Sequence, residues 1–242
     1  MSKLPAGLFI TGTGTDVGKT VVTAGLARFF MQYGGKVLAV KPVQSGGIML
    51  PDGRMGSPDG EVYKAAGAVW DSERQCPFIF EPACSPHLAA KLSGAELQIS
   101  EITEKIRALE AEGLLLVEGA GGIMVPLNES STMLDLMCEL SYPVVLVSEN
   151  KLGSINEALL SIAALKQAGL GVAAVIMTAA NSPAPTGFGM AEDNIRTIEK
   201  FSGVKVLASI PHIPDWNHND SRCWEKVDSA LSHLDSAAFL NM

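Results

Sequence analysis

Six short runs of almost uninterrupted apolar residues set the strongest limit on how this chain can fold. They occupy residues 8–11, 36–41, 114–118, 143–148, 172–177 and 205–210. A strand that faces water on one side alternates apolar and polar residues, whereas a parallel strand buried on both faces is apolar throughout. The runs therefore predict parallel strands in the interior of a sheet.

The segments between most of these runs have the spacing of amphipathic helices. After the first run, Val22, Leu26 and Phe29 fall on one helical stripe. Ser154 and Glu157 have the spacing of a capping box at the start of another helix. This alternation predicts an α/β fold in which a mostly parallel sheet is flanked by helices on both faces. Because no stretch resembles a linker, we expect a single domain over residues 1–242.

The composition excludes several classes of protein. The 242 residues are 47% apolar, which is enough for a large core, and the formal net charge is −8. Because sequence-independent binding of nucleic acid needs a cationic surface, we expect no nucleic-acid partner. No apolar stretch reaches the roughly 18–20 residues that a membrane-spanning helix requires, so we expect no membrane partner either.

The cysteines and the N-terminal residues indicate a cytoplasmic protein. The four cysteines form no C-x-x-C pair and share no zinc-finger spacing with the four histidines. Free thiols are the usual state of cysteine in a reducing compartment. The N-terminal residues carry one cation and a very short apolar run, which is not the pattern of a signal peptide.

The strongest local signal is Gly-Thr-Gly-Thr-Asp-Val-Gly-Lys-Thr over residues 12–20. It lies between a strand pattern and a helix pattern, as a phosphate-binding loop does. Glycines let backbone N–H groups turn toward phosphate oxygens, Lys19 can reach the outer phosphates, and the Thr20 hydroxyl can bind Mg²⁺. The spacing is unusual, since five residues separate Gly12 from Gly18 where the common pattern has four. The alternative is a glycine-rich turn followed by a chance Lys-Thr pair.

Two carboxylates are candidates for holding a metal beside that loop. Glu118 ends an apolar run, and ligands of open α/β sheets bind at the carboxyl ends of the strands. The alternative is a solvated glutamate before a glycine turn. Asp59 follows Ser57 and Pro58, which together have the pattern of a helix start. Its carboxylate therefore either binds a metal or only complements the helix dipole.

Lys41 is a candidate for a second cation at the same edge of the sheet. It ends the second apolar run, and Pro42 after it stops strand pairing. A cation in this place holds an acidic substrate or stabilises charge on a transferring phosphoryl group. The alternative is an ordinary lysine at a strand end, with its stem on the surface and its ammonium group in water.

Five segments resemble the dethiobiotin synthetase family of P-loop proteins, and they occur in the order of that family. They are residues 11–20, 41–46, 85–87, 117–122 and 151–156. The five-residue spacing of the loop is the family's own form. The resemblance implies a P-loop NTPase-like fold and an ATP-dependent ligase of biotin biosynthesis. Such an enzyme carboxylates 7,8-diaminononanoate with CO₂ and closes a ureido ring through a carbamic–phosphoric anhydride, releasing ADP and phosphate.

The resemblance also implies roles for individual residues. The expected catalytic groups are Thr15, Lys19, Lys41 and Ser45. The expected Mg²⁺ ligands are Thr20, Asp59 and Glu118. The expected ATP-binding residues are Gly14, Thr15, Asp16, Val17, Gly18, Lys19, Thr20, Val21, Asp59, Glu118, Gly119, Ala120, Gly121, Thr178, Pro211, His212 and Ile213. The expected substrate-binding residues are Lys41, Ser45, Gly121, Gly153, Ser154 and Asn156.

Two further expectations follow from the resemblance. Thr178 stands where the family often has an asparagine that reads adenine, so the chain departs from the family at the base. The helix start over residues 153–156 comes, in the family, from the neighbouring subunit and receives the substrate carboxylate. We therefore expect a homodimer whose site is shared across the interface, with the diamine, CO₂ or bicarbonate, and ATP as its small-molecule partners.

Two other functions remain open on the sequence. A dimeric P-loop ATPase switch of the partition type carries a signature lysine four residues before the glycine of Gly-Lys-Thr, and here Gly14 occupies that position. A cobyrinate amide synthetase-like domain usually accompanies a glutaminase domain, for which 242 residues leave no room. An ATP-binding fold without catalysis is a third alternative.

Overall fold

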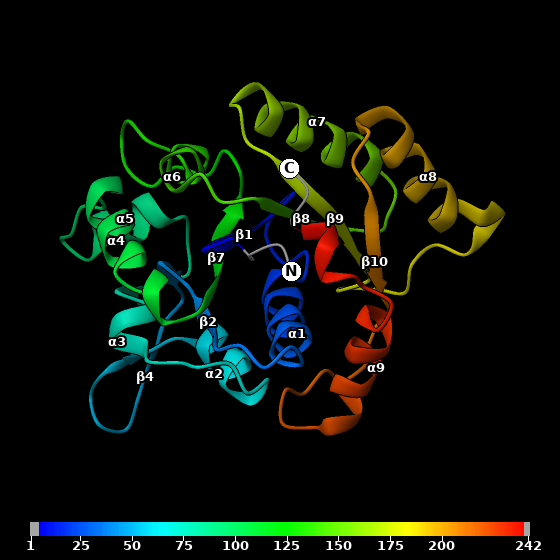
Figure 1. Ribbon diagram of the computed structural model, residues 1–242. Coiled ribbons are helices and arrows are strands. Elements are labelled where there is room, and N and C mark those ends of the chain that lie inside the picture. The colour runs from blue at the N-terminus through cyan, green and yellow to red at the C-terminus, as the bar shows by residue number, and fades with distance from the viewer. Residues whose placement is uncertain (1–4, 240–242) are drawn as a thin grey trace.

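In the computed structural model, which describes residues 5–239, six parallel strands form the central sheet (Figure 1). They are β1 (Gly7–Gly12), β2 (Val37–Val40), β7 (Leu114–Gly122), β8 (Val144–Glu149), β9 (Val172–Thr178) and β10 (Val206–Ile210). Each strand overlaps one of the predicted apolar runs. Residues 1–4 and 240–242 of the predicted domain lie outside the described residues.

The position of β1 in the sheet explains why the runs are apolar. The strand order is β10-β9-β8-β1-β7-β2, so β1 pairs with β8 on one side and with β7 on the other. Side chains alternate along a strand, and those of Leu8 and Ile10 lie in one apolar core while that of Phe9 lies in the other. Since both faces are covered, neither set of side chains meets water.

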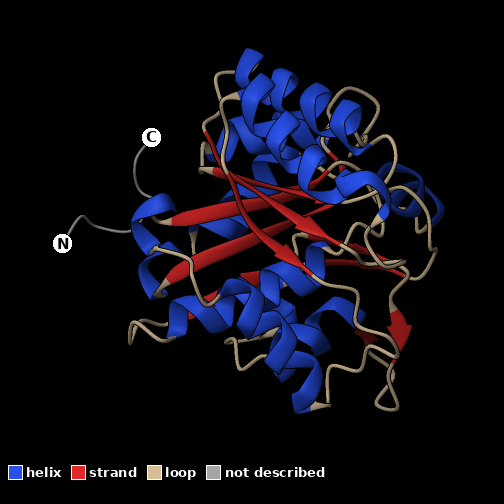
Figure 2. Cartoon of the chain, turned by 90° about the vertical axis from the view of Figure 1, so that its right-hand side faces the viewer, coloured by secondary structure: helices blue, strands red, loops and turns tan. Residues whose placement is uncertain are grey.

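Helices cover both faces of the sheet, which confirms the predicted fold class. One face carries α1 (Lys19–Met31), α2 (Pro58–Ala65) and α9 (Ser221–Leu231). The other face carries α4 (Pro86–Leu92), α5 (Ile99–Arg107), α6 (Met133–Leu140), α7 (Ser154–Gln167) and α8 (Met190–Ser202). Figure 2 shows the strands in red between two layers of helices in blue.

The chain between β2 and β7 adds small elements beside the main sheet. They are β3 (Val43–Ser45), which pairs with β6 (Phe78–Phe80); β4 (Ile48–Met49), which pairs with β5 (Met55–Gly56); and α3 (Ser72–Gln75). Short 3₁₀ segments lie elsewhere at Glu110–Glu112, Gly187–Gly189 and Ser236–Phe239. Helix α2 starts as the sequence predicts, because the Ser57 hydroxyl accepts a hydrogen bond from the Gly60 N–H at 3.0 Å.

Two local predictions are corrected by the structure. The capping box at Ser154 is wrong, because Gly153 is the N-cap of α7 with a φ of 98° and Ser154 is the first helical residue. A glycine accepts this left-handed conformation without strain, so it takes the cap position. The Ser154 hydroxyl is instead buried without a hydrogen-bond partner. Strand β7 continues past Glu118 to Gly122, so this glutamate lies within the strand and not at its end.

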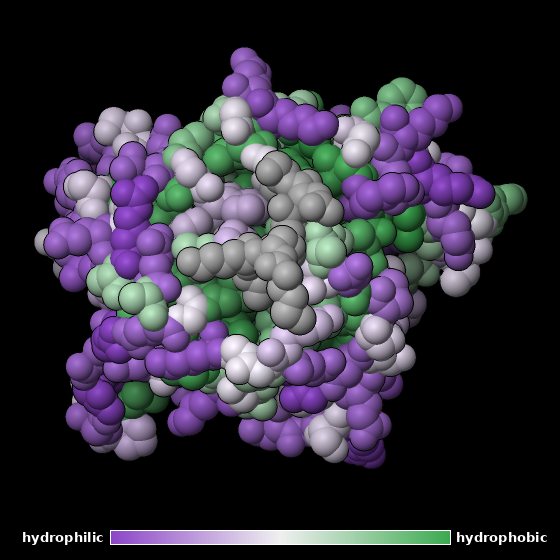
Figure 3. Space-filling view, in the orientation of Figure 1, coloured by the Kyte–Doolittle hydropathy of each residue, from purple (hydrophilic) through white to green (hydrophobic). Residues whose placement is uncertain are grey.

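The chain has an excess of acidic side chains, and part of its surface is strongly hydrophilic. On the face shown in Figure 3, hydrophilic residues predominate at the periphery and apolar residues gather toward the middle. The chain has 26 aspartates and glutamates against 18 lysines and arginines. Within residues 5–239, none of the helices combines the length and the hydropathy that crossing a bilayer demands.

Candidate functional site

A cleft opens at the carboxyl ends of β1, β2 and β7, where residues from distant parts of the sequence meet. Its lining includes many predicted site residues, namely Thr15, Asp16, Gly18, Lys19, Thr20, Val21, Lys41, Ser45, Asp59, Glu118, Ala120 and Gly121. Asn181 also lines it, as do Val43 and Gln44, which no motif in the sequence marks. The convergence follows from the topology, because parallel neighbouring strands end at the same edge of the sheet.

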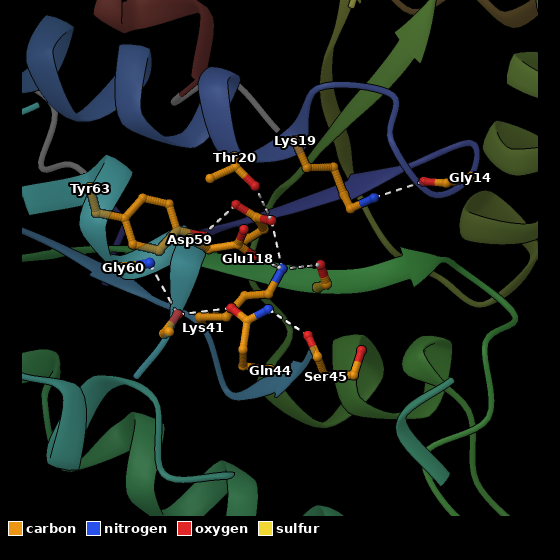
Figure 4. A network of polar contacts seen from close by, with 12 residues as sticks. Gly14, Lys19, Thr20, Lys41, Gln44, Ser45, Asp59, Gly60, Tyr63 and Glu118 are labelled. Carbon is orange, nitrogen blue, oxygen red and sulfur yellow. Dashed lines mark hydrogen bonds and ion pairs between the residues drawn. The ribbon is translucent and has the colours of Figure 1, made fainter. Parts of the chain in front are cut away.

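The loop between β1 and α1 has the conformation that a phosphate-binding loop needs. Gly18 precedes α1 with a φ of 88°, and a side chain there would lie 3.2 Å from Thr178 Cγ2. The Lys19 ammonium group donates to the Gly14 carbonyl at 2.7 Å, so it folds back over the loop (Figure 4). The Thr20 hydroxyl points the other way and donates to Glu118 Oε1 at 3.1 Å. The loop is thereby connected to the candidate metal ligands.

Lys41 lies between the two candidate metal-binding carboxylates. Its Nζ atom is 2.7 Å from Asp59 Oδ2 and 2.7 Å from Glu118 Oε1. The Lys41 side chain is 6% exposed and that of Glu118 is 1% exposed, which excludes the solvated alternatives for both. Asp59 therefore does more than complement the dipole of α2, because its carboxylate forms an ion pair across the cleft.

The two lysines of the cleft respond differently to burial. Burial lowers the pKa of Lys19 to about 8, because the lost hydration, together with repulsion from Lys41, outweighs the attraction of the nearby carboxylates. Burial also acts to lower the pKa of Lys41, but Glu118 and Asp59 outweigh it and raise that pKa above the ordinary value of a lysine. Lys41 therefore keeps its charge at neutral pH, whereas the charge of Lys19 depends on what binds beside it.

Tyr63 is part of the cluster although the sequence analysis does not single it out. It lies in α2 one turn after Asp59, and its hydroxyl donates to Glu118 Oε2 (Figure 4). Its ring is fully buried and contacts Trp70 edge-on, with 5.3 Å between the ring centroids. Burial, followed by the charges of Glu118 and Asp59, raises the pKa of Tyr63 well above its usual range, so the hydroxyl stays a donor.

Replacing Tyr63 with phenylalanine is expected to lower the free energy of unfolding by about 1.5–3 kcal/mol, the range for a hydrogen bond to a charged group. The substitution keeps the buried ring and leaves Glu118 Oε2 without its donor. Urea denaturation followed by circular dichroism measures the effect. Tyr33→Phe is the matched control, because Tyr33 is 56% exposed. Equal losses in the two variants would contradict the proposed contribution of the Tyr63 hydroxyl.

A second network fixes the backbone at Ser45. Gln44 is buried, and its side-chain carbonyl accepts a hydrogen bond from the Ser57 hydroxyl at 2.8 Å. Its amide group donates to the Ser45 carbonyl at 2.8 Å. Because Ser57 is also the N-cap of α2, Gln44 connects the start of the helix that carries Asp59 to the strand that carries Ser45.

The oxygen atoms around Lys41 are of the kind that a hard divalent cation prefers. Glu118 and Asp59 supply carboxylates and Thr20 supplies a hydroxyl, and Mg²⁺ is usually held in proteins by one or two carboxylates together with phosphate oxygens and water. Nowhere in residues 5–239 do three or more His, Cys, Asp or Glu side chains gather to hold a metal by themselves. The donor set thus fits a cation that arrives with a phosphate ligand.

An apolar pocket adjoins the loop on the side of β9 and β10. Three of the residues expected to bind ATP line it, namely Thr178, Pro211 and Ile213. The ring of His212 is not in the lining and instead lies 3.0 Å from the Ala179 carbonyl through its Nδ1 atom. Trp216 lines the pocket as well, and no sequence periodicity marks it, because it follows β10 in a loop.

Three of the predicted substrate-binding residues lie at the start of α7, apart from the cleft. Gly153, Ser154 and Asn156 are not in the lining of either the cleft or the apolar pocket. Asn156 is exposed, whereas the Ser154 side chain is fully buried. Within one chain the structure therefore does not bring these residues to the P-loop. Of the other predicted residues, Gly119 contributes its carbonyl, 3.4 Å from Lys41 Nζ.

Comparisons with known proteins identify relatives over most of the chain. A family model described as an AAA domain matches residues 6–219. The ATP-dependent dethiobiotin synthetase BioD of Anoxybacillus flavithermus is 37% identical over 222 residues, which cover 91% of this chain and 97% of that protein. The BioD protein of Halalkalibacterium halodurans is 39% identical over 209 residues, covering 86% of this chain and 85% of that protein.

Solved structures of similar shape share the fold at low sequence identity. The MinC:MinD cell division protein complex of Aquifex aeolicus includes a chain with a TM-score of 0.56 and 14% identity, and the match covers 95% of this chain and 97% of that one. The septum site-determining protein MinD of Pyrococcus horikoshii, complexed with Mg-ADP, has a TM-score of 0.52 and 19% identity, with 97% and 92% covered. These likenesses establish the P-loop NTPase fold, and the sequence relatives establish the family. The chain belongs to the dethiobiotin synthetase family.

Proposed function

We propose that this chain is an ATP-dependent dethiobiotin synthetase, a ligase of biotin biosynthesis. It carboxylates 7,8-diaminononanoate with CO₂ and closes the ureido ring at the expense of ATP. The observation that supports this most directly is the buried Lys41 beside the P-loop, held by Asp59 and Glu118 at the edge of an open cleft. Such a cation serves a reaction in which an anionic substrate attacks a phosphoryl group.

The reaction needs no nucleophile from the protein. One amine of the substrate takes up CO₂ as a carbamate, and a carbamate oxygen attacks the γ-phosphorus, so the bond to ADP breaks. The second amine then attacks the carbonyl carbon of the resulting anhydride, and phosphate leaves as the ring closes. Lys19 and Lys41 neutralise the charge that gathers on the phosphoryl group and the carbamate. Thr15 and Ser45, both in the cleft lining, orient these groups by hydrogen bonds.

We further propose that Thr20, Asp59 and Glu118 hold Mg²⁺ when ATP binds. An ion held there would neutralise charge on the phosphates and stabilise the charge that develops on the γ-phosphoryl group. Support comes from the chemistry of the three donors described above. In the protein alone, Lys41 balances the two carboxylates, which keeps them together in a buried place.

The assay that tests the function measures phosphate release with each substrate omitted in turn. Purified protein is expected to release phosphate and form dethiobiotin only when diaminononanoate, bicarbonate and MgATP are all present. Phosphate release that is indifferent to the diamine would contradict the proposal and favour an ATPase switch. Release that depends on the diamine without formation of dethiobiotin would contradict it as well.

The affinity for ATP is expected to fall as the pH rises above about 8. Protonated Lys19 is the form that binds phosphate oxygens, and in the ligand-free protein its pKa is about 8. Above that pH, binding requires uptake of a proton, so the dissociation constant rises by up to about tenfold per pH unit. Calorimetry in two buffers with different ionisation enthalpies measures the uptake. Lys19→Arg is the control, because arginine stays charged and takes up no proton. The same proton uptake in both proteins would assign it to another group.

We infer that two copies of the chain share their substrate sites. The exposed Asn156 lies at the start of α7, apart from the cleft of its own chain, and the helix N-terminus favours a substrate carboxylate. Leu152 is 87% exposed and Leu160 is 63% exposed on the same segment, as expected of side chains that a second copy covers. Gly153 and Ser154 contribute through their backbone, since the Ser154 side chain faces the interior.

Mixing two impaired variants tests this arrangement, at a diamine concentration that saturates the parent but lies far below the raised KM of one variant. Asn156→Ala is expected to raise the KM for the diamine, and Lys41→Ala is expected to slow phosphoryl transfer about a thousandfold. An equimolar mixture allowed to exchange subunits should regain about a quarter of the parent activity, because half of the dimers are mixed and each holds one intact site. A mixture no more active than the average of its components would place Lys41 and Asn156 in the same subunit's site.

We also infer that the chain acts as one nucleotide-binding domain in the cytoplasm. The P-loop, Glu118 and the apolar pocket all lie at the edge of the same sheet. The four cysteines are free thiols, as a reducing compartment favours.

A further inference from the structure

The apolar pocket contains an aromatic side chain whose position is fixed by a backbone turn and by contacts with its neighbours. Trp216 lines the pocket together with Gly18 and Val21, the residues on either side of the Lys-Thr pair of the P-loop. The preceding residue, Asp215, has a φ of 52°, a left-handed conformation that few non-glycine residues adopt. This turn directs the chain after β10 back over the sheet and brings Trp216 to the P-loop.

Trp216 is supported by a second tryptophan outside the pocket lining. Its ring contacts Trp224 of α9 in a T-shaped arrangement, with 5.1 Å between the centroids and 78° between the planes. Trp224 is 4% exposed and donates from its indole N–H to the His218 carbonyl at 2.8 Å. The guanidinium group of Arg28 lies 5.3 Å from the centre of the Trp224 ring. The support is therefore rigid, and Trp216 loses little freedom when a flat ligand binds against it.

Two polar side chains at this pocket, those of Thr178 and His212, are already engaged. The Thr178 hydroxyl donates its proton to the Val17 carbonyl at 2.8 Å. The His212 imidazole is held at the Ala179 carbonyl, outside the lining. In the described part of the chain, Thr178 and Trp216 alone bring polar side-chain atoms to the lining. The pocket thus offers apolar area and one aromatic ring, with no free amide or carboxylate to read the edge of a base.

We propose that Trp216 is the base-binding residue of this chain and that it selects nucleotides by ring area instead of by hydrogen bonding. The inference rests on the proposed nucleotide site and adds to it the class of nucleotide accepted. Stacking of a base on an aromatic side chain is largely indifferent to the identity of the base, because every base has a π-face. Purine triphosphates therefore bind with similar affinity, and pyrimidine triphosphates, which have smaller rings, bind more weakly.

The test compares dissociation constants for MgATP, MgGTP, MgCTP and the magnesium salt of inorganic tripolyphosphate, measured by calorimetry without the diamine. In the parent protein, ATP and GTP are expected to agree within about fivefold and CTP to bind more weakly. Trp216→Leu should weaken ATP and GTP binding about 10- to 100-fold, the range for loss of one stacking contact. Trp216→Phe should restore most of the affinity. Tripolyphosphate, which has no base, should bind all three proteins equally.

The affinity for tripolyphosphate distinguishes the loss of a contact with the base from damage to the fold. A leucine variant that loses ATP and tripolyphosphate affinity together would make Trp216 a structural residue and overturn the proposal. A parent protein that prefers ATP over GTP by a hundredfold or more would also overturn the proposal, since such a preference requires protein groups that form hydrogen bonds with the edge of the base. Phe201→Leu, which removes an aromatic side chain that is 71% exposed on α8, should leave every constant unchanged. A protein that binds nucleotides as expected but forms no dethiobiotin would refute the proposed function alone.

Discussion

The Lys41→Ala protein is expected to form dethiobiotin about a thousandfold more slowly than the parent at saturating MgATP, while its dissociation constant for ATP changes by less than about tenfold. In the ligand-free structure Lys41 binds Asp59 and Glu118, with Gly119 O at 3.4 Å, all at the edge where the γ-phosphate and carbamate meet in the proposed reaction. Loss of one preorganised cation at developing negative charge typically removes about 3–4 kcal/mol of transition-state stabilisation. Single-turnover rates with calorimetric ATP affinities measure both quantities.

The same variant is expected to be less stable without ligand, which sets the design of the controls. Removing one partner of a buried ion pair typically lowers the free energy of unfolding by about 3–5 kcal/mol. Activity is therefore expressed per folded molecule. Lys36→Ala is the matched control, because Lys36 lies just before the other end of β2 and is 45% exposed at its side chain. Equal losses in rate and ATP affinity would make Lys41 a ligand of bound ATP and not a group that acts in the transition state.

The Glu118→Gln protein is expected to lose at least a hundredfold in rate and to require a much higher Mg²⁺ concentration for what remains. Glu118 accepts hydrogen bonds from Thr20 and Lys41 at one oxygen and from Tyr63 at the other. A glutamine keeps the shape of the side chain but removes the charge and turns an N–H₂ group toward one set of donors. Both changes weaken a cation site that depends on Glu118.

A magnesium titration of the rate tests this prediction. The apparent Mg²⁺ affinity should fall together with the rate in Glu118→Gln and stay unchanged in Glu112→Gln. Glu112 is the matched control because it lies two residues before β7, at the end of that strand opposite the cleft. A slow Glu118→Gln enzyme with the Mg²⁺ dependence of the parent would assign Glu118 to holding Lys41 and not the metal.

The strands were predictable from the sequence because burial on both faces leaves a strong local signal. The order of the strands was not, since the pairing of β1 with β7 joins residues more than a hundred positions apart, such as Phe9 and Val117. Because parallel strands end at one edge of a sheet, the proximity of Lys41 and Glu118 could be predicted without knowledge of that order.

Site residues that belong to a sequence motif were predictable, whereas residues that only tertiary packing brings to the site were not. Tyr63 lies four residues after Asp59 in a helix whose start was recognised, so helical spacing could have placed both on one face. Gln44 and Trp216 lie in a short edge strand and a loop, where no periodicity marks an inward-facing side chain. The predicted N-cap at Ser154 is wrong because the pattern S-x-x-E does not determine which residue precedes the helix. In the structure Gly153 is the N-cap.

The interior position of β1 has a consequence for how such an enzyme diverges over evolutionary time. On one side of this strand, β7 carries Glu118 and Lys41 follows directly after β2; on the other, the pocket with Trp216 lies at the ends of β9 and β10. On the role proposed for Trp216, mutations in the second region alter which nucleotide the ligase uses, and the lining of that pocket includes none of Lys41, Asp59 and Glu118. A lineage can thus retune its nucleotide choice by small inherited steps, each of which leaves a working ligase.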